Sequence, residues 1–281
     1  MPASIRAPSR RILLEPLNPD NFAPFGSVIE NPSHSRSKLK TTLQSIPANQ
    51  GSARKWVDVT TATNFYSLAP SRQPGRLTVS LFMCSPRQLH APVTSLDEEA
   101  IRAVPNTQPT WAQPPATAQP APGIFNVSIL ERHPYTSQTF IPLGLGKADK
   151  STHYLVIVAP TLPSPRRTRP KPYQSPEPDA ETANPSLSRE PAGPGAPDLS
   201  AIRAFLANGS QAVTYGAGTW HAPMVVVGRE TVDFVVVQHV SGVPDEDCQE
   251  VLLERAKGGE GLTVLVDLDG RSKASFLRAR L

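Results

Sequence analysis

The sequence predicts a mainly β protein, folded as an antiparallel β-barrel or sandwich. Short runs rich in β-branched and aromatic residues recur along the chain, and Gly and Pro separate them. Many short strands joined by such turns favour a sheet that closes on itself or packs on a second sheet. The runs that carry this prediction are residues 76–84, 124–130, 154–158, 224–227 and 233–238.

Two segments predict helices on the flank of this β-structure. Residues 199–207 follow Asp198, a favourable N-cap, carry apolar side chains at helical spacing and end at an Asn-Gly pair. Residues 245–256 begin with acidic side chains, which suit the positive end of a helix dipole, and stop shortly before a Gly-Gly pair. We expect both helices to pack against the outside of the barrel.

Three further segments lack the pattern of a strand or a helix. Residues 105–122 and 160–197 are rich in Pro, Ala, Ser and Thr, and they bury too little apolar surface to offset the entropy cost of ordering. We expect both to be disordered or polyproline-like inserts. Residues 1–11 read as a short disordered leader. The remainder, residues 12–281, is predicted to be a single domain that the two inserts interrupt.

Composition narrows the classes of function. The net charge of +4 is modest, and basic residues gather in the second insert and at the C-terminal end, so we expect no nucleic-acid partner. No apolar stretch is long enough to predict a membrane span. The chain has 2 Cys, too few for a disulfide framework or a cysteine-based zinc site. We expect a cytoplasmic or a peroxisomal location, because Ala279-Arg280-Leu281 is similar to the peroxisomal address Ser-Lys-Leu.

The most informative segment is residues 130–142, which combine an acid, a base, hydroxyls and an amide in one extended run. Side chains two apart on a strand share a face, so Glu131 and His133 are predicted to point one way and Arg132 the other. Pro134 has no N–H to donate and is predicted to end the strand. The sequence therefore places a carboxylate and an imidazole side by side.

A second polar segment, residues 215–223, carries His221 beside Trp220 and after a glycine turn. An imidazole has a pKa near neutrality and suits a general acid or base. His133 and His221 are therefore the candidate catalytic residues, and Glu131 is a candidate for orienting His133. The alternative for each histidine is a hydrogen-bonded structural role, and for Glu131 it is a solvated position on a strand. The two segments can act together only if folding joins them.

Motifs in a fixed order along most of the chain resemble those of the ureidoglycolate lyases, also called ureidoglycolate hydrolases, of allantoin breakdown. The resemblance implies a cupin-like β-barrel and a homodimer. Together with the sequence patterns above, the expected fold is a cupin-like antiparallel β-barrel with flanking helices and Pro-rich disordered inserts. The matching motifs include Phe22-Ala23-Pro24-Phe25-Gly26, Asn49-Gln50-Gly51, Ser85-Pro86-Arg87, Glu131-Arg132-His133-Pro134, Ser137-Gln138, Phe140-Ile141-Pro142, Asn208-Gly209, Gly218-Thr219-Trp220-His221 and Asp247-Cys248.

The implied reaction splits ureidoglycolate into glyoxylate and urea. It needs a base for the substrate hydroxyl, an acid for the departing urea, a cation for the carboxylate and amide-like partners for the ureido group. Two alternatives stay open: an amidohydrolase that releases ammonia from the same substrate, and a non-catalytic cupin-like protein that binds a small molecule. The candidate substrate-binding residues are Lys55, Arg87, Asn49, Ser137, Gln138, Tyr215 and Trp220.

The resemblance also suggests a metal site. Cupins that bind a divalent ion use His and Glu side chains from two strand motifs, and Glu131, His133 and His221 could supply a reduced set with open coordination positions. Nickel or manganese would be the ion. The elimination does not itself need a metal, so the expectation is either no required cofactor or one such ion.

Overall fold

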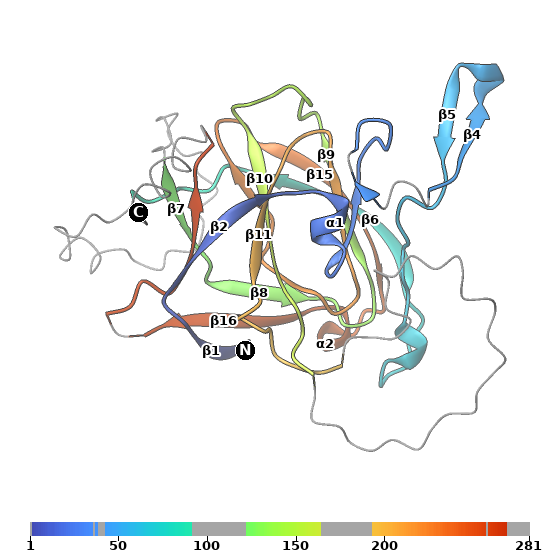
Figure 1. Cartoon of the computed structure of the whole chain (residues 1–281). Coiled ribbons are helices and arrows are strands. Elements are labelled where there is room, and N and C mark those ends of the chain that lie inside the picture. The colour runs from blue at the N-terminus through green and yellow to red at the C-terminus, as the bar shows by residue number, and fades with distance from the viewer. Residues whose placement is uncertain are drawn as a thin grey trace.

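The computed structural model describes residues 2–35, 37–38, 43–91, 122–163, 193–256 and 258–268. These residues form a mainly β fold, as predicted, in which curled sheets make a cupin-like half-barrel (Figure 1). Residues 105–121 and 164–192 of the predicted inserts lie outside the described part of the chain, and so does the tripeptide 279–281.

Two sheets build the half-barrel. The first has the order β1-β16-β8-β13-β10-β11-β2-β17-β7, with β14 also paired to β10. Its strands are β1 (Ala3–Ala7), β2 (Arg10–Pro16), β7 (Gly123–Asn126), β8 (Ile129–Arg132), β10 (His153–Ala159), β11 (Arg203–Ala207), β13 (Trp220–His221), β14 (Val225–Val227), β16 (Gln249–Arg255) and β17 (Leu262–Val266).

The second sheet has the order β3-β12-β9-β15-β6. Its strands are β3 (Gly26–Ile29), β6 (Arg76–Cys84), β9 (Gln138–Leu143), β12 (Ala212–Tyr215) and β15 (Val232–Val240). The helical elements in the described ranges are short: α1 (Pro19–Phe22), η2 (Asn49–Gly51), η3 (Tyr66–Leu68) and α2 (Pro244–Asp247).

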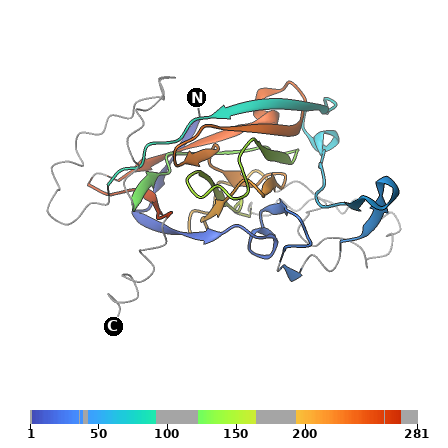
Figure 2. The ribbon, with the colours of Figure 1, turned by 90° about the horizontal axis from the view of Figure 1, so that it is seen from above.

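A separate hairpin, residues 45–56, stands clear of the half-barrel (Figures 1 and 2). We call it the arm. It consists of β4 (Ser45–Ala48) and β5 (Ala53–Trp56), which pair with each other around η2.

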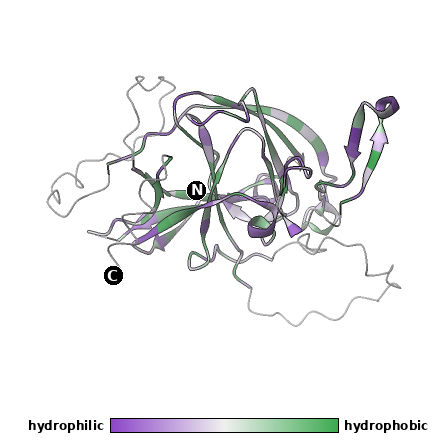
Figure 3. Ribbon diagram, turned by 45° about the horizontal axis from the view of Figure 1, so that its top comes forward, coloured by the Kyte–Doolittle hydropathy of each residue, from purple (hydrophilic) through white to green (hydrophobic). Residues whose placement is uncertain are grey.

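The core lies on both faces of β10. Leu155 and Ile157 belong to one cluster of buried apolar side chains, and Tyr154, Val156 and Val158 belong to a second. A strand buried on both faces carries a continuous apolar run, which is why residues 154–158 are so hydrophobic. Figure 3 shows apolar residues along the strands that surround this interior.

The prediction of two flanking helices is wrong. Residues 203–207 form β11, paired with β10 and β2, because Ala204 and Phe205 bury on opposite faces in different core clusters. Helix α2 is a single turn, and most of residues 245–256 form β16, paired with β8 and β1. Val251 and Leu253 are buried between exposed neighbours, which is the period of a strand and not of a helix.

The prediction of a disordered leader at residues 1–11 is also wrong. Strand β1 pairs in parallel with β16, and β2 lies between β11 and β17. Ala7 and Ile12 are buried in the first core cluster. Composition misses this ordering because the partners of these strands come from the far end of the chain.

The predicted strands at 76–84, 154–158, 224–227 and 233–238 are confirmed as β6, β10, β14 and β15. The run at 124–130 is divided between β7 and β8. In the part of the chain described, no helix is both long and apolar enough to cross a membrane.

Candidate active site

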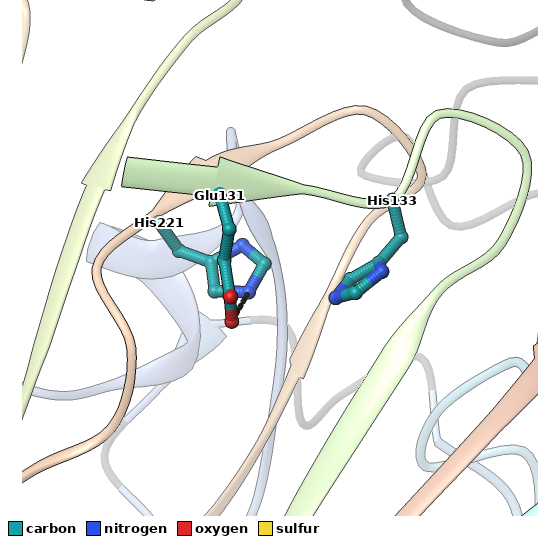
Figure 4. Close-up of side chains that lie close together, drawn as sticks. All are labelled: Glu131, His133 and His221. Atoms are coloured by element: carbon teal, nitrogen blue, oxygen red, sulfur yellow. Dashed lines mark ion pairs between the residues drawn. The ribbon is translucent and has the colours of Figure 1, made fainter. Parts of the chain in front are cut away.

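Strand register brings the two polar segments together. His221 of β13 lies directly opposite Glu131 of β8, and His133 follows Glu131 by two residues. Figure 4 shows the three side chains pointing toward one another. The Nε2 atom of His221 is 3.4 Å from Oε1 of Glu131, and the centroids of the two imidazole rings are 5.5 Å apart. We call Glu131, His133 and His221 the His–Glu cluster.

Backbone carbonyl groups fix the tautomer of both histidines. Nδ1 of His133 lies 2.6 Å from the carbonyl oxygen of Asp247, and Nδ1 of His221 lies 2.9 Å from that of Thr219. A carbonyl oxygen can only accept, so each Nδ1 carries a proton, and Nε2 is the nitrogen of each ring that can bind a ligand or exchange a proton. Both Nε2 atoms are buried and lack a hydrogen-bond partner among the described residues.

These two unpartnered atoms indicate a site for a ligand or a reacting group. Leaving one buried polar atom unpaired costs about 1–3 kcal/mol, so two such atoms beside one carboxylate are not expected in a purely structural cluster. The potential ligand atoms of the His–Glu cluster all lie within 4.8 Å of one another. The cluster can therefore hold a divalent cation or exchange protons with a bound molecule.

Electrostatics set the charge states. Burial lowers the pKa of the His133 imidazole, and the neighbouring His221 lowers it further. Burial alone would raise the pKa of Glu131, but its contacts with His221 and His133 outweigh burial and hold that pKa below the ordinary value. At neutral pH His133 is therefore an uncharged base, and Glu131 is a carboxylate.

Tyr215 of β12 forms one wall of the site. Its ring stacks on His221 with a centroid separation of 4.0 Å and an interplanar angle of 9°. Burial raises the pKa of the Tyr215 phenol well above 10, so this side chain stays neutral. The stacking restricts rotation of the imidazole and links the second sheet to the first at the site.

Gln138 contributes an amide from β9. It lies opposite Gln238 of β15, and its Nε2 donates a hydrogen bond to Oε1 of Gln238. This bond orients the amide so that Oε1 of Gln138, which is buried, has no partner in the described structure. The amide is close enough to His133 to influence its pKa, so the free acceptor belongs to the same site.

Two other predicted substrate-binding residues have structural partners. Oγ of Ser137 accepts a hydrogen bond from the backbone N–H of Thr63 at 2.8 Å and donates to the carbonyl of Thr61 at 3.3 Å. Trp220 precedes His221 on β13 and therefore faces the other way, where the Arg132 guanidinium lies 4.7 Å from its ring centroid. Neither residue is part of the His–Glu cluster.

The remaining predicted residues also lie apart from the cluster. The guanidinium of Arg87 is 5.7 Å from the ring centroid of Phe125. Asn49 and Lys55 are both on the arm, outside the half-barrel (Figure 1). Within one chain, the structure thus gathers Gln138 and Tyr215 around the cluster and leaves the predicted cations elsewhere.

Sequence reasoning missed the residue that holds His133. The Asp247 carbonyl accepts from that ring, and the Asp247 carboxylate accepts from Tyr66 Oη at 2.6 Å and from the N–H groups of Ser241 and Gly242, both at 2.7 Å. Asp247 is therefore a positioning residue. The predicted helix at 245–256 hid it, because a helix would have used that carbonyl internally.

Cys248 and Glu250 were missed for the same reason. Residues two apart on a strand share a face, and their ligand atoms lie within 4.8 Å of those of Glu131. Burial, reinforced by Glu131 and Glu250, raises the pKa of the Cys248 thiol to about 12. The thiol is therefore protonated at neutral pH and is a weak nucleophile and metal ligand.

Comparison with known proteins identifies the family. A family model described as ureidoglycolate lyase matches residues 9–257, a range that includes the whole His–Glu cluster. The chain belongs to the ureidoglycolate lyase family. A ureidoglycolate lyase of Saccharomyces cerevisiae is 31% identical over 85% of this chain and 92% of its own length. Those of Schizosaccharomyces pombe and Burkholderia cepacia are 29% and 28% identical, over 86% and 89% of this chain and 91% and 96% of theirs.

Asp247→Ala should release the ring of His133. Loss of the carboxylate frees the loop whose carbonyl fixes the Nδ1–H tautomer, so the side-chain ¹⁵N NMR signals of His133 should change from one tautomer to a mixture. Asp149→Ala is the matched control, because Asp149 also accepts backbone N–H groups, those of Ser151 and Thr152, in an exposed turn. An unchanged His133 spectrum in a folded Asp247→Ala variant would show that the ring is held by other contacts.

Proposed function

We propose that this chain is a ureidoglycolate lyase, an enzyme that splits ureidoglycolate into glyoxylate and urea. The observation that carries the proposal is the pair of unpartnered Nε2 atoms of His133 and His221 beside the Glu131 carboxylate, within the range that matches the family. The relatives in two yeasts, which this chain matches over most of their length, are named ureidoglycolate lyases.

The reaction requires one proton to leave and one to arrive. One carbon of the substrate bears a hydroxyl, a carboxylate and the ureido nitrogen. Removal of the hydroxyl proton lets the oxygen form a carbonyl group, the carbon–nitrogen bond breaks with its electron pair going to nitrogen, and that nitrogen takes up a proton as urea leaves. The products are glyoxylate and urea, with no net consumption of water or oxidant.

The charge states favour His133 as the base. Its ring is neutral at neutral pH, because burial and His221 lower its pKa, and its Nε2 lone pair faces the site. His221 then serves as the acid in its doubly protonated form, which gives up the Nε2 proton, and Glu131, at 3.4 Å from that Nε2, stabilises the imidazolium before the transfer. Tyr215 keeps the His221 ring in place by stacking.

Gln138 is suited to the ureido group. A ureido group offers several N–H donors, and the free Oε1 acceptor of Gln138 is held toward the site by the hydrogen bond from Nε2 to Gln238. A substrate that lacked these N–H groups would leave the buried acceptor unpaired. The site would therefore discriminate strongly against such a substrate, because the cost of leaving the buried acceptor unpaired adds to the loss of the hydrogen bond.

The same residues fit a divalent metal ion. The candidate ligand atoms are Nε2 of His133 and Nε2 of His221, which lack hydrogen-bond partners, and an oxygen of the ionised Glu131 carboxylate. Both Nδ1–H groups donate to backbone carbonyls, an arrangement that orients histidines which bind metals. A bound nickel or manganese ion would polarise substrate oxygens as a Lewis acid. One lone pair cannot hold both a metal and a proton, so ion binding and proton transfer by these rings exclude each other.

The enzyme is also proposed to act as a homodimer, as the resemblance to the family implies. Its partner in the reaction is a small molecule, and the histidines that would act on it are buried where the two sheets meet.

Purified protein should convert ureidoglycolate into equal amounts of glyoxylate and urea. Parallel assays of urea, glyoxylate and ammonia would identify the products, with the spontaneous decay of the substrate subtracted. Ammonia as the first nitrogen-containing product would show that the protein is an amidohydrolase and not a lyase. No turnover above the spontaneous rate would indicate a binding protein.

His133→Ala and His221→Ala should each lower kcat by about 100-fold or more, the usual effect of losing a positioned acid or base. The double variant should be little worse than either single variant, because both residues act on one transition state. His34→Ala is the control, since His34 is exposed and lies outside the cluster. A folded double variant with near-normal turnover would place the site elsewhere.

Metal binding can be measured without reference to activity. Wild-type protein dialysed with Ni²⁺ or Mn²⁺ should retain about one ion per chain by elemental analysis, and both His variants should lose it. Turnover that disappears with a chelator and returns with the ion would make the metal the active species. Wild-type protein that retains no ion but remains active would assign the two Nε2 atoms to proton transfer alone.

A further inference from the structure

A pair of glutamines interrupts the apolar inner side of the second sheet. On this side, Phe140 of β9 lies opposite Val236 of β15, and both are buried in the second core cluster. Two residues further along each strand, and therefore on the same side, Gln138 lies opposite Gln238. An apolar pair at this place would extend the core, so the polar pair needs a reason other than packing.

Strand register places the glutamine pair beside the His–Glu cluster. Gln138 lies opposite Tyr215 of β12, and the Tyr215 ring stacks on His221 with a centroid separation of 4.0 Å. Burial and His221 lower the pKa of His133, and the Gln138 side chain opposes this shift, as a hydrogen-bond acceptor does. The amide oxygen of Gln138 therefore faces the His133 ring. Since Nδ1 of that ring is bonded to the Asp247 carbonyl, the nitrogen that it faces is Nε2.

Two buried acceptors thus face each other across the site. Neither Oε1 of Gln138 nor Nε2 of His133 has a hydrogen-bond partner among the described residues. Two neighbouring donor groups on one ligand would satisfy both. Ureidoglycolate carries a hydroxyl and a ureido N–H on the same carbon, so the hydroxyl can donate to the base while the N–H donates to the amide oxygen.

The direction of the Gln138 amide decides whether the base is free. The oxygen and nitrogen ends of an amide have nearly the same shape but opposite hydrogen-bonding character. Turned end for end, the amide would donate an N–H to Nε2 of His133, and that base would be satisfied without substrate. A base whose lone pair already accepts a hydrogen bond is less able to take a proton. The reversed amide would therefore inhibit the site.

Gln238 opposes this reversal. Its Oε1 accepts a hydrogen bond from Nε2 of Gln138, and this bond is lost if the Gln138 amide turns, because two oxygens would then meet. Nε2 of Gln238 is not among the buried atoms that lack a partner in the described ranges. The backbone of Gln238 is held as well, since Oγ1 of Thr78, opposite it on β6, donates to its carbonyl at 3.0 Å.

We propose that Gln238 is a positioning residue that keeps the Gln138 amide from turning onto His133. Held in this direction, the amide leaves the base free and offers its own acceptor to the ureido N–H, so that the two acceptors bind two donors on a single carbon. Gln238 acts through Gln138. The effect on turnover rests on the proposed function, whereas the direction of the amide does not.

Gln238→Leu tests this role by removing the acceptor. In ¹⁵N-labelled protein without substrate, the Leu variant should show a scalar coupling through an N–H···N hydrogen bond between Nε2 of Gln138 and Nε2 of His133. Wild type should lack this coupling. Gln238→Glu keeps an acceptor at the same place and should resemble wild type.

Thr78→Val is the matched control for these spectra, because it removes a hydrogen bond to the backbone of Gln238 and leaves the pair of amides intact. Circular dichroism verifies folding, and Gln238→Met replaces Gln238→Leu if that variant is unfolded. A wild-type protein that shows the N–H···N coupling would overturn the proposal, because its amides would be turned the other way. A folded variant without the acceptor that lacks the coupling would overturn it as well.

Turnover measures what the direction of the amide contributes to the reaction. The kcat of Gln238→Leu should fall about tenfold or more, because its base is already hydrogen-bonded. Gln238→Glu should stay within about threefold of wild type, since a carboxylate also accepts from the Gln138 amide. In a chain that already carries Gln138→Leu, Gln238→Leu should have little further effect. A Glu variant as slow as the Leu variant, or losses that simply add, would show that Gln238 acts through another contact and overturn the proposal.

The spectra and the kinetics separate this proposal from the proposed function. The spectra are recorded without substrate, so they test the direction of the Gln138 amide even where ureidoglycolate is not turned over. A wild-type protein without turnover, whose amide still points its oxygen at His133, would refute the lyase assignment alone.

Discussion

The candidate active site depends on the register of β13, a strand of two residues. Its His221 lies opposite Glu131 on one side and Val158 of β10 on the other, so the deepest strand of the core sets the position of the imidazole. The turn before β13 is fixed as well, because the N–H of Gly218, which has a positive φ of 78°, donates to the carbonyl of His133 at 2.8 Å. One short strand therefore determines the spacing of both histidines.

Alternation along β8 and β13 separates two kinds of buried polar group. On one face, Arg132 is fully engaged: its Nε and Nη2 donate to Oε1 of Gln249 at 2.9 and 2.7 Å, and its Nη1 donates to the carbonyl of Gly193 at 2.9 Å. On the other face, His133 and His221 each keep an unpartnered nitrogen. Buried polar nitrogens without a hydrogen-bond partner are rare in protein interiors, so the contrast between the two faces identifies the site.

The sequence allowed the strand-rich fold and the central cluster to be predicted, because period-two patterns and the i, i+2 rule are local. It did not allow β11, β16 or β1 to be predicted. Each has a pattern that could also be helical or unstructured, and the outcome depends on pairing with distant strands. The hydrogen bond from His133 to the Asp247 carbonyl was equally out of reach, since every residue has a carbonyl and only the tertiary structure selects one.

The pairing of β1 with β16 has a consequence for synthesis of the chain. Ala3 lies beside Val251 and Ala7 beside Arg255, so β1 is made long before the strand with which it pairs, β16. The carbonyl that orients His133 also comes from residue 247. Contacts this distant in sequence form late and slow folding. A nascent chain that has not reached residue 247 would therefore lack an ordered site, and activity would appear only after β16 had been made.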